Sequence, residues 1–215
     1  MAVVIKTNMH SGTHVDAPLH FVSGGLDVSQ IPLDRLHGTA LVVDLSHQVE
    51  EWTVVTRSMV ESALPDQIRE DDILIIHYGW HKYSWVGEEN NEERYFVRCP
   101  GPSVDLVEWI VEKKLKWVGC DCPSFEHPLW TGFRDMRPDL CRAFEERFGA
   151  PIEELLPARH MFHSHRRLLA RNILHVDNIG GDISEVLGRR VTVGAFPWRF
   201  YGGEASICRL VAFAE

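Results

Sequence analysis

The stretch from residue 10 to residue 20 reads His10-Ser11-Gly12-Thr13-His14-Val15-Asp16-Ala17-Pro18-Leu19-His20. It places three histidines and one aspartate within eleven residues, with the spacing His-x3-His-x-Asp-x3-His. Imidazole and carboxylate ligands together suit Zn, Mn or Fe better than Ca or Mg. A divalent metal held there can activate a water molecule at neutral pH and polarise a carbonyl group. The stretch therefore predicts a metal-dependent hydrolase, and the alternative is a histidine-rich surface loop with one capping aspartate.

The backbone of this stretch is predicted to be extended rather than helical. His10 and His14 have the spacing of one helix face, but Gly12 between them and a proline soon after them disfavour a continuous helix. In a strand, side chains alternate between the two faces, so that His14 and Asp16 share one face. A turn at Ser11-Gly12 would then place His10 beside the same metal.

The stretch resembles the signature of the cyclase-like metal-dependent hydrolases, a family that includes bacterial kynurenine formamidases and isatin hydrolases. The resemblance covers most of the chain and implies an α/β fold in a single domain, residues 1–215, with a mixed sheet or barrel-like core and flanking helices, of the swivelling β/β/α type. Further segments are similar to family motifs: Gly79-Trp80 to "TGW" with Tyr78 in place of Thr, Pro100-Gly101-Pro102-Ser103 to "PGLS", Val118-Gly119-Cys120-Asp121-Cys122-Pro123-Ser124 to "GIDxPS", and His165 with Asp177, twelve residues apart, to a second His and Glu pair.

The resemblance implies a role for each histidine of the first motif. His10, His14 and Asp16 would hold the first metal. His20 would be the general acid/base, because a histidine changes its charge close to working pH.

The resemblance also implies a second metal, held by His165 and Asp177 and bridged by Asp16. Asp177 stands where the family usually has Glu, so that this ligand is one methylene shorter and the second site is weak or absent. Isatin-hydrolase-like members work with one metal, usually manganese. We therefore expect one or two Zn or Mn ions per chain. His160 and His163 compete with His165 for its role, and the separation from Asp177 favours His165.

The start of the chain departs from the family pattern, because only nine residues precede His10. Family members usually carry several tens of residues there, with an opening strand and an aromatic residue that lines the pocket. The expected domain therefore lacks the usual N-terminal segment. Either the pocket is more open, another subunit closes it, or the true start lies upstream. Because the family forms homodimers or higher multiples, we expect a homo-oligomer, a dimer or a tetramer.

Composition agrees with an enzyme in the cytoplasm that acts on a small molecule. The length of 215 residues suits one domain, and the net charge of −9 argues against a nucleic-acid partner. No apolar run approaches the roughly 20 residues of a membrane span, and no signal-peptide pattern opens the chain. Five cysteines without framework spacing indicate reduced thiols.

Other residues are candidates for the substrate pocket or for packing. Trp80, Asp121, Ser124 and Phe125 are expected at the pocket. The aromatic residues Tyr83, Trp85 and Trp130 could also line it, and the alternative for all the aromatic residues is core packing. Cys120 and Cys122 are too close together for a usual zinc-thiolate pair, so that we expect packed thiols beside the pocket.

The rest of the chain alternates strand-like and helix-like segments. Short runs of Val, Ile and Leu predict buried strands, and apolar residues three or four positions apart predict helices. The segment from Asp72 to Asp121 is a predicted βαβ unit. The acidic segment 87–94 is expected to be solvated surface or, alternatively, a mobile flap. The expected strands are 39–45, 72–77, 116–121, 173–177, 190–196 and 205–214, the last two as an antiparallel pair, and the expected helices are 57–64, 102–114 and 138–148.

Capping signals set the ends of these helices. Ser58 and Glu61 have capping-box spacing, and Gly149 is expected as a C-terminal stop. Ser164 is expected to cap a helix that carries His165.

The predicted reaction is the attack of a metal-activated water on the carbonyl carbon of an amide, formamide, cyclic imide or lactone. His20 would relay a proton to the leaving nitrogen or oxygen. Neither a serine-hydrolase elbow nor a dinucleotide or P-loop motif is present in the sequence. The alternative is a catalytically inactive metal- or ligand-binding protein on the same scaffold, against which the retained His20 argues.

Overall fold

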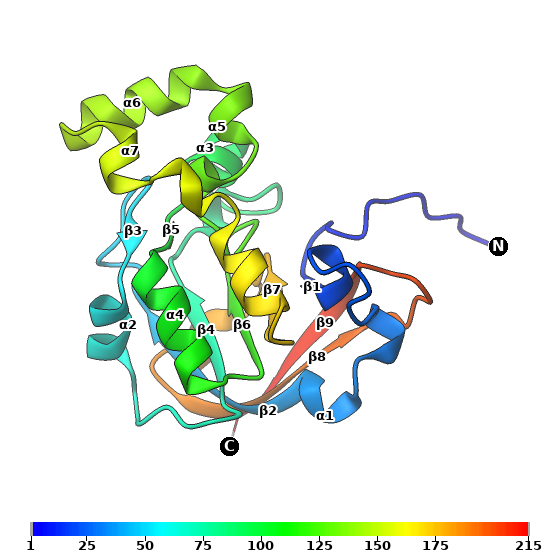
Figure 1. The fold of residues 1–215 in the computed structure, drawn as a ribbon. Helices are drawn as coiled ribbons and strands as arrows, with labels where there is room; N and C mark the ends of the chain where they lie inside the picture. Colours follow the sequence, from blue (N-terminus) through cyan, green and yellow to red (C-terminus); the bar gives the residue numbers. More distant parts are fainter. Residues whose placement is uncertain (1, 215) are drawn as a thin grey trace.

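Seven strands close into a barrel in the order β1-β7-β6-β4-β2-β8-β9 (Figure 1). The computed structural model describes residues 2–214. β1 pairs antiparallel with both β7 and β9 and so closes the barrel. The strands are β1 (His14–Asp16), β2 (His37–Asp44), β4 (Ile73–His77), β6 (Trp117–Cys120), β7 (Leu174–Asp177), β8 (Arg190–Pro197) and β9 (Ala205–Phe213).

The four central strands β2, β4, β6 and β7 run parallel, and they are rich in buried Val, Ile and Leu. Buried parallel strands have continuous apolar sequences, because both faces of their sheet are covered. Alternate residues such as Val42, Ile75 and Val176 join residues from β1, β8 and β9 in one apolar cluster that fills the barrel. The intervening residues, such as Val43 and Leu74, pack instead against the helices outside.

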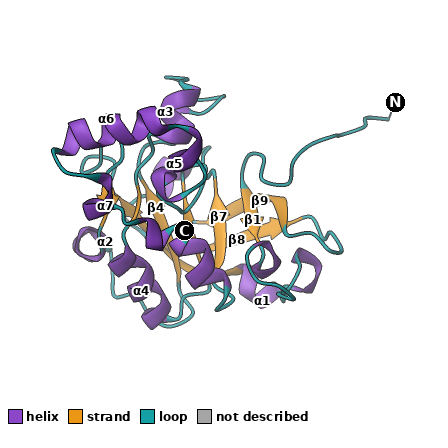
Figure 2. Ribbon diagram, turned by 45° about the horizontal axis from the view of Figure 1, so that its top comes forward, coloured by secondary structure: helices purple, strands orange, loops and turns teal. Residues whose placement is uncertain are grey.

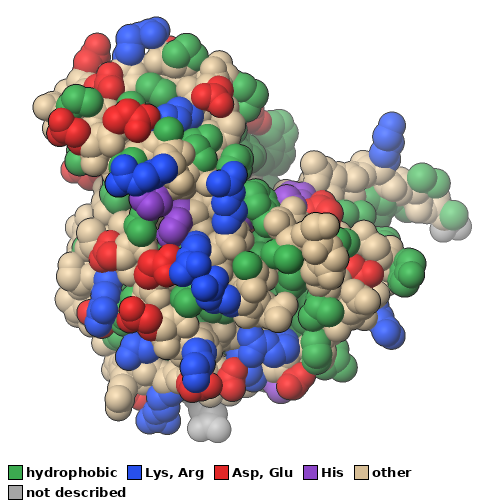
Figure 3. Space-filling view, in the orientation of Figure 1, with side chains coloured by type: hydrophobic (Ala, Val, Ile, Leu, Met, Phe, Trp, Pro, Cys, Tyr) green, Lys and Arg blue, Asp and Glu red, His purple; other side chains and the backbone are tan. Residues whose placement is uncertain are grey.

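Helices cover the parallel side of the barrel and one of its ends. α4 lies against the parallel strands, and α5, α6 and α7 gather with α3 at one end of the molecule (Figures 1 and 2). Acidic and basic side chains are interspersed on the face shown in Figure 3. The helices are α1 (Leu33–Leu36), α2 (Arg57–Ala63), α3 (Glu92–Val97), α4 (Val104–Lys113), α5 (Phe133–Met136), α6 (Pro138–Phe148) and α7 (Ile152–Leu155).

Short helical turns and one small sheet complete the fold. The 3-10 turns are η1 (Pro18–His20), η2 (Val28–Gln30), η3 (His81–Tyr83), η4 (Pro128–Trp130), η5 (Ala158–His160) and η7 (Ile183–Val186), and η6 (His165–Leu169) is a π-helical turn. β3 (Val54–Val55) and β5 (Gly101–Pro102) form a separate parallel pair. Within residues 2–214, no helix is both long and apolar enough to cross a membrane.

The predicted α/β barrel-like core with flanking helices is confirmed, as are the βαβ unit β4-α4-β6 and the antiparallel pair β8-β9. Ser103 caps α4 through the Leu106 N–H, and Gly149 ends α6 at φ 66°. The small elements α3, α5, α7, β3 and β5 were not predicted, because segments of two to six residues carry too little periodicity to be read. The acidic segment 87–94 is mostly exposed, and its second half begins α3.

Two predicted caps are wrong. The cap of α2 is Thr56, whose hydroxyl accepts from the Met59 N–H, so that Ser58 lies inside the helix and Glu61 pairs with Arg57 at 3.0 Å. Ser164 already has helical angles, and its hydroxyl donates to Glu126 Oε1 at 3.3 Å instead. α2 thus begins before the residue that the local signal indicated, and Ser164 precedes η6 without capping it.

Candidate metal centre

Four polar side chains face one another across the pair β1 and β7. The antiparallel register places His14 opposite Asp177 and Asp16 opposite His175. Because side chains alternate along a strand, all four point to the same face of the sheet. All four are also almost fully buried. The strand pairing therefore builds a buried cluster of two carboxyl and two imidazole groups.

A turn before β1 adds His10 to this cluster. Gly12 has a φ of 64°, in the left-handed region that glycine adopts without strain, and the chain folds back there. His10 Nδ1 then lies 3.0 Å from Asp16 Oδ1, and His14 Nε2 lies 3.4 Å from the same oxygen. His10 and His14 therefore both lie beside the same oxygen of Asp16.

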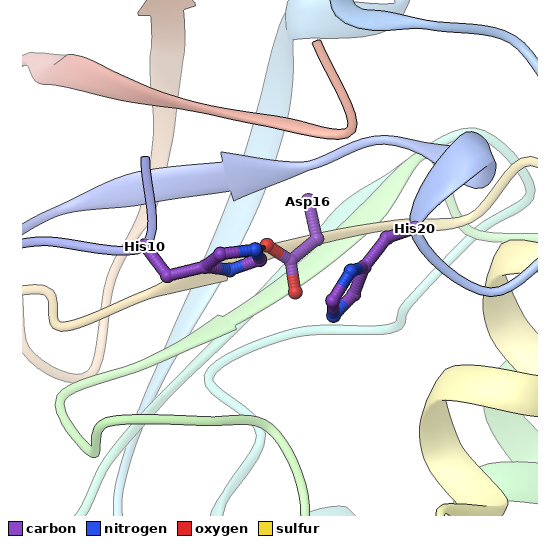
Figure 4. Close-up of side chains that lie close together, drawn as sticks. All are labelled: His10, Asp16 and His20. Carbon is purple, nitrogen blue, oxygen red and sulfur yellow. Dashed lines mark ion pairs between the residues drawn. The ribbon is translucent and has the colours of Figure 1, made fainter. Parts of the chain in front are cut away.

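His20 reaches the same place from the turn η1, as Figure 4 shows for His10, Asp16 and His20. Its ring centre lies 4.5 Å from that of His10. His20 Nδ1 lies 2.6 Å from Glu204 Oε2, and the same oxygen lies 2.8 Å from His10 Nε2. Sequence analysis missed Glu204, because it precedes β9 and lies 194 residues from His10.

His165, the first residue of η6, also lies near Asp16. Its Nδ1 lies 3.0 Å from Glu126 Oε2, and its Nε2 lies 3.8 Å from Asp16 Oδ2. A carboxylate behind one imidazole nitrogen fixes the tautomer and directs the other nitrogen, as in many metal sites. Glu126 was not identified from the sequence, although it follows the Asp121-to-Phe125 motif region directly.

His175 is a further residue that sequence analysis missed. It is fully buried, its ring centre lies 4.7 Å from that of His165, and neither of its nitrogens has a hydrogen-bond partner. Burial and the charge of His165 hold the pKa of His175 well below its usual value, so that the ring is neutral. Its place two residues before Asp177 on a predicted strand was the signal that could have found it.

The charges of the cluster are strongly coupled. Burial acts to raise the pKa of Asp16, but the adjacent His10 and His14 side chains outweigh it and hold this pKa well below its usual value. Burial and the neighbouring Asp16 raise the pKa of Asp177 to about 7. Burial acts to lower the pKa of His10, but Asp16 and Glu204 raise it to about 9. Asp16 is thus ionised at neutral pH, whereas Asp177 is partly protonated there.

The cluster fits a divalent transition-metal ion. Asp16 Oδ1 is buried, and although His10 Nδ1 and His14 Nε2 lie 3.0 and 3.4 Å away, neither ring makes a hydrogen bond to it, as expected of an oxygen placed to bind a cation. Imidazole and carboxylate donors are the set that Zn, Mn and Fe bind. Groups of donor atoms that lie within 4.8 Å of one another, and could hold an ion, are His10, Asp16 and His20; His14, Asp16 and Asp177; and Asp16, His165 and His175. Asp177 thus groups with His14, whereas His165 groups with His175.

The candidate pocket residues lie in two places. Phe125 is fully buried, with its ring centre 5.8 Å from that of His175, and Ser124 is half-buried in the same loop. Asp121 is also buried, but it binds the backbone of residues 78–81, and Trp80 lines a cavity of about 690 Å³ beside it. Tyr83 lines the same cavity, Trp130 is buried in a third apolar cluster, and Trp85 is exposed.

Two aromatic residues that the sequence analysis did not single out border the cluster instead. The Phe21 ring centre lies 4.9 Å from that of His20, 4.7 Å from that of His165 and 5.4 Å from that of Phe162. Phe21 and Phe162 are both half-buried. The position of Phe21 directly after His20 was the available signal.

The predicted thiols are packing residues. Cys120 and Cys122 are fully buried in the apolar cluster outside the barrel. Burial raises the pKa of Cys120 to about 11, so that the thiol is neutral, and its Sγ lies 3.8 Å from Asp177 Oδ1.

The chain belongs to the Cyclase family, whose model matches residues 3–127, more than half of the 215 residues. It is 32% identical over 117 residues to kynurenine formamidase of Erythrobacter litoralis, which covers 54% of this chain and 47% of that protein. It is 28% identical over 212 residues to cyclase-like protein 3 of Arabidopsis thaliana (96% and 63%), and 27% identical over 125 residues to isatin hydrolase of Roseibium aggregatum (53% and 46%). The matched part of the chain thus covers 47%, 63% and 46% of the length of these three relatives.

Solved structures confirm the fold. An isatin hydrolase bound to the product analogue thioisatinate superposes with a TM-score of 0.73 at 19% identity, over 96% of this chain and 72% of that chain. Isatin hydrolase A from Ralstonia solanacearum superposes with a TM-score of 0.71 at 19% identity, over 95% and 72%. The barrel and its helices are therefore the architecture of the family.

Proposed function

We propose that this chain is a metal-dependent hydrolase of a small carbonyl compound. It would cleave the C–N bond of an amide, formamide or cyclic imide, or the C–O bond of a lactone. The observation that carries the proposal is that His10 and His14 both lie within 3.4 Å of the same oxygen of Asp16, with His20 beside Glu204. The relatives named kynurenine formamidase and isatin hydrolase support the same class of reaction.

His10, His14 and Asp16 would hold the metal, either zinc or manganese. When bound, such an ion supplies Lewis acidity that polarises a carbonyl and activates water. Asp16 supplies the charge for binding, because its pKa is held low and it is ionised at neutral pH. His165 and Asp177 are candidates for a second ion, and both approach Asp16 or its neighbour His14.

His20 would move the proton. Burial and the charges of His10 and His165 lower the pKa of His20, with Asp16 and Glu204 acting in the opposite direction. His20 is therefore neutral near pH 7 and able to accept a proton. Because the Glu204 carboxylate lies 2.6 Å from Nδ1, its charge favours a proton on that nitrogen, and the free lone pair of the neutral ring then lies on Nε2. His20 Nε2 is the atom that would take a proton from the attacking water and return it to the leaving nitrogen or oxygen.

The residues around His20 favour a small, flat substrate. Phe21 and Phe162 place two half-buried rings beside His20 and His165. Aromatic faces stack on planar groups, and their apolar surface strengthens electrostatic interactions by excluding water. An aromatic or cyclic carbonyl compound therefore fits between these rings better than an extended peptide does.

A substrate panel tests the proposal directly. Purified protein would be assayed on an aryl formamide, a cyclic imide, isatin and a lactone, with and without a chelator, and after Zn²⁺ or Mn²⁺ is added back. We expect hydrolysis of at least one compound, loss with chelator and recovery with metal. The matched control is His20→Ala, which should stay inactive after metal is restored. Metal binding without hydrolysis of any compound would favour the alternative, an inactive metal- or ligand-binding protein.

A further inference from the structure

A second group of donor atoms lies outside the cluster around Asp16, at the carboxyl ends of the parallel strands β4 and β6. His77 is the last residue of β4, His81 opens the turn η3, and Asp121 follows β6 directly. One donor atom from each lies within 4.8 Å of the others. His77 and His81 line the cavity of about 690 Å³ that also contains Trp80. Parallel strands bring loops together at their carboxyl ends, which is where α/β folds build binding sites.

His77 has the geometry of a metal ligand that lacks its metal. Its side chain is only 8% exposed, and its Nδ1 lies 3.0 Å from Asp44 Oδ1. Asp44 is held in turn by the Ser46 N–H, at 3.0 Å. The Nδ1–H of His77 therefore donates to Asp44, which leaves the lone pair on Nε2. That Nε2 is buried and has no hydrogen-bond partner. A carboxylate behind a histidine, with the other nitrogen free, is the arrangement that orients histidine ligands.

Asp121 is fixed by the backbone and faces both histidines. Its Oδ1 accepts from the Tyr78 N–H at 2.7 Å, and its Oδ2 accepts from the Trp80 N–H at 2.6 Å. Asp121 Oδ2 lies 3.7 Å from His77 Nε2, and it is hydrogen-bonded to His81 Nδ1 at 3.1 Å, a contact that a bound ion would replace. Bonds of about 2.0–2.1 Å in a tetrahedral zinc site place ligand atoms about 3.3 Å apart. The separations in this group are therefore close to those of ligands around one ion.

The group is accessible from the cavity, and no unpaired basic side chain among the described residues of the cavity wall would repel a bound cation. The His81 side chain is 32% exposed and opens into the cavity, so that a bound ion would keep a position open to water. The basic residues of the cavity wall are already paired with carboxylates: Lys82 with Glu89 at 3.1 Å, Arg94 with Glu51 at 3.1 Å, and Arg147 with Glu50.

We propose that His77, His81 and Asp121 form a second metal site, separate from the cluster around Asp16, that takes Zn²⁺ or a similar divalent transition-metal ion. Two imidazoles and one carboxylate, with an open fourth position, match the donor set that such ions bind. The proposal does not depend on hydrolytic activity, because the two groups share no residue.

The test locates and counts zinc in the full chain. Crystals of the metal-loaded protein would be measured at the zinc absorption edge, and the metal-free protein would be titrated with Zn²⁺ by calorimetry. We expect an anomalous peak between His77 Nε2, His81 and Asp121 Oδ2. His81→Ala should lose one equivalent of Zn²⁺, or bind it at least tenfold more weakly, and should keep the peak at Asp16. The backbone bond from the His81 N–H to Asp121 stays in this variant, so that the loop keeps its support.

The matched control is His47→Ala, an exposed histidine in the wall of the same cavity that is not part of the group. It should leave the stoichiometry unchanged. His77→Gln is the second variant, in case the first one unfolds, and should also remove the equivalent. An absent anomalous peak at saturating Zn²⁺ would overturn the proposal, as would a stoichiometry that neither variant changes. If the protein binds this second zinc ion but hydrolyses none of the compounds in the substrate panel, only the proposed function is contradicted.

Discussion

His20 Nδ1 lies 2.6 Å from Glu204 Oε2, which joins the end of the first motif to the turn before β9. The same oxygen lies 2.8 Å from His10 Nε2. Glu204 thus orients two histidines at once, one a candidate ligand and the other the candidate acid/base. Its side chain is 43% exposed, so that solvent screens its charge beyond these two direct contacts.

Glu204→Gln should lower kcat/KM about tenfold or more while the metal content stays the same. Glutamine keeps the size of the side chain but removes the charge that favours the Nδ1–H tautomer of His20. The readouts are the pH–rate profile, whose limb for His20 should shift, and metal analysis of the purified variant. Glu88→Gln, in the exposed acidic segment, is the control. An unchanged profile would mean that Glu204 does not position His20.

Metal binding and proton transfer should separate in two variants. His14→Ala should lose metal and activity together, because His14 lies 3.4 Å from Asp16 Oδ1 within the cluster. His20→Ala should keep the metal and lose about 10²–10⁴-fold in rate, as expected when a general acid/base is removed. Elemental analysis and the substrate panel would be run on both. Complete loss of metal from His20→Ala would identify His20 as a ligand of the first ion.

The number of ions around Asp16 should depend on the length of residue 177. We expect one tightly held ion there in the wild type, because aspartate has about 1 Å less reach than glutamate and metal bonds must be near 2.1 Å. Asp177→Glu should raise the occupancy around Asp16 to two, and His165→Ala in that background should return it to one. Anomalous scattering counts these ions separately from any at His77. Two ions around Asp16 in the wild type would contradict the expectation.

The stability of the protein should fall in mild acid through His127. This histidine is fully buried between the Trp52 carbonyl and the Leu129 N–H, and burial lowers its pKa from 6.5 to about 4. The unfolded chain binds the proton more readily, so that this stabilisation is complete above pH 6.5 and decreases as the pH falls from 6.5 to about 4. The total effect is about 3 kcal/mol.

Urea unfolding of the wild type and His127→Gln as a function of pH measures this effect. The variant is less stable at pH 7 but should lose less stability on acidification, because it carries no ionisable group there. Comparing the two chains removes the contribution of the histidines around Asp16, which both contain. Equal slopes between pH 6.5 and 4 would show that His127 does not titrate in this range.

We expect a homo-oligomer whose activity falls on dilution. Large apolar side chains are exposed in the loop after η3, where Trp85 and Val86 are 79% and 90% exposed, and in the connection between β8 and β9. A neighbouring subunit would cover such surface. Light scattering at assay concentration, with activity measured over a dilution series, tests this. Trp85→Ser should weaken assembly, and a fully active monomer would contradict the prediction.

The sequence alone predicted the central strands, the helices α4 and α6, and the site residues of the first motif. His10, His14 and Asp16 could be placed because their contacts arise within seven residues, from strand alternation and one glycine turn. The buried strands were readable because parallel strands covered on both faces have continuous apolar runs. The cap of α2 was not, because Thr56 and Ser58 offer the same local signal. Ser164 does not cap η6, because its hydroxyl donates to Glu126, 38 residues away.

Only the tertiary structure decided which distant residues complete the site. Glu204 reaches His20 because β9 pairs with β1, and His175 faces Asp16 because β7 pairs with β1 in one register. His77 meets Asp121 through the parallel pairing of β4 and β6. Strand order and register follow from the packing of the whole barrel, and a single sequence carries no local signal for them. The local spacing of residues 10–20 therefore determined the chemistry of the first cluster, and the closed barrel determined its partners.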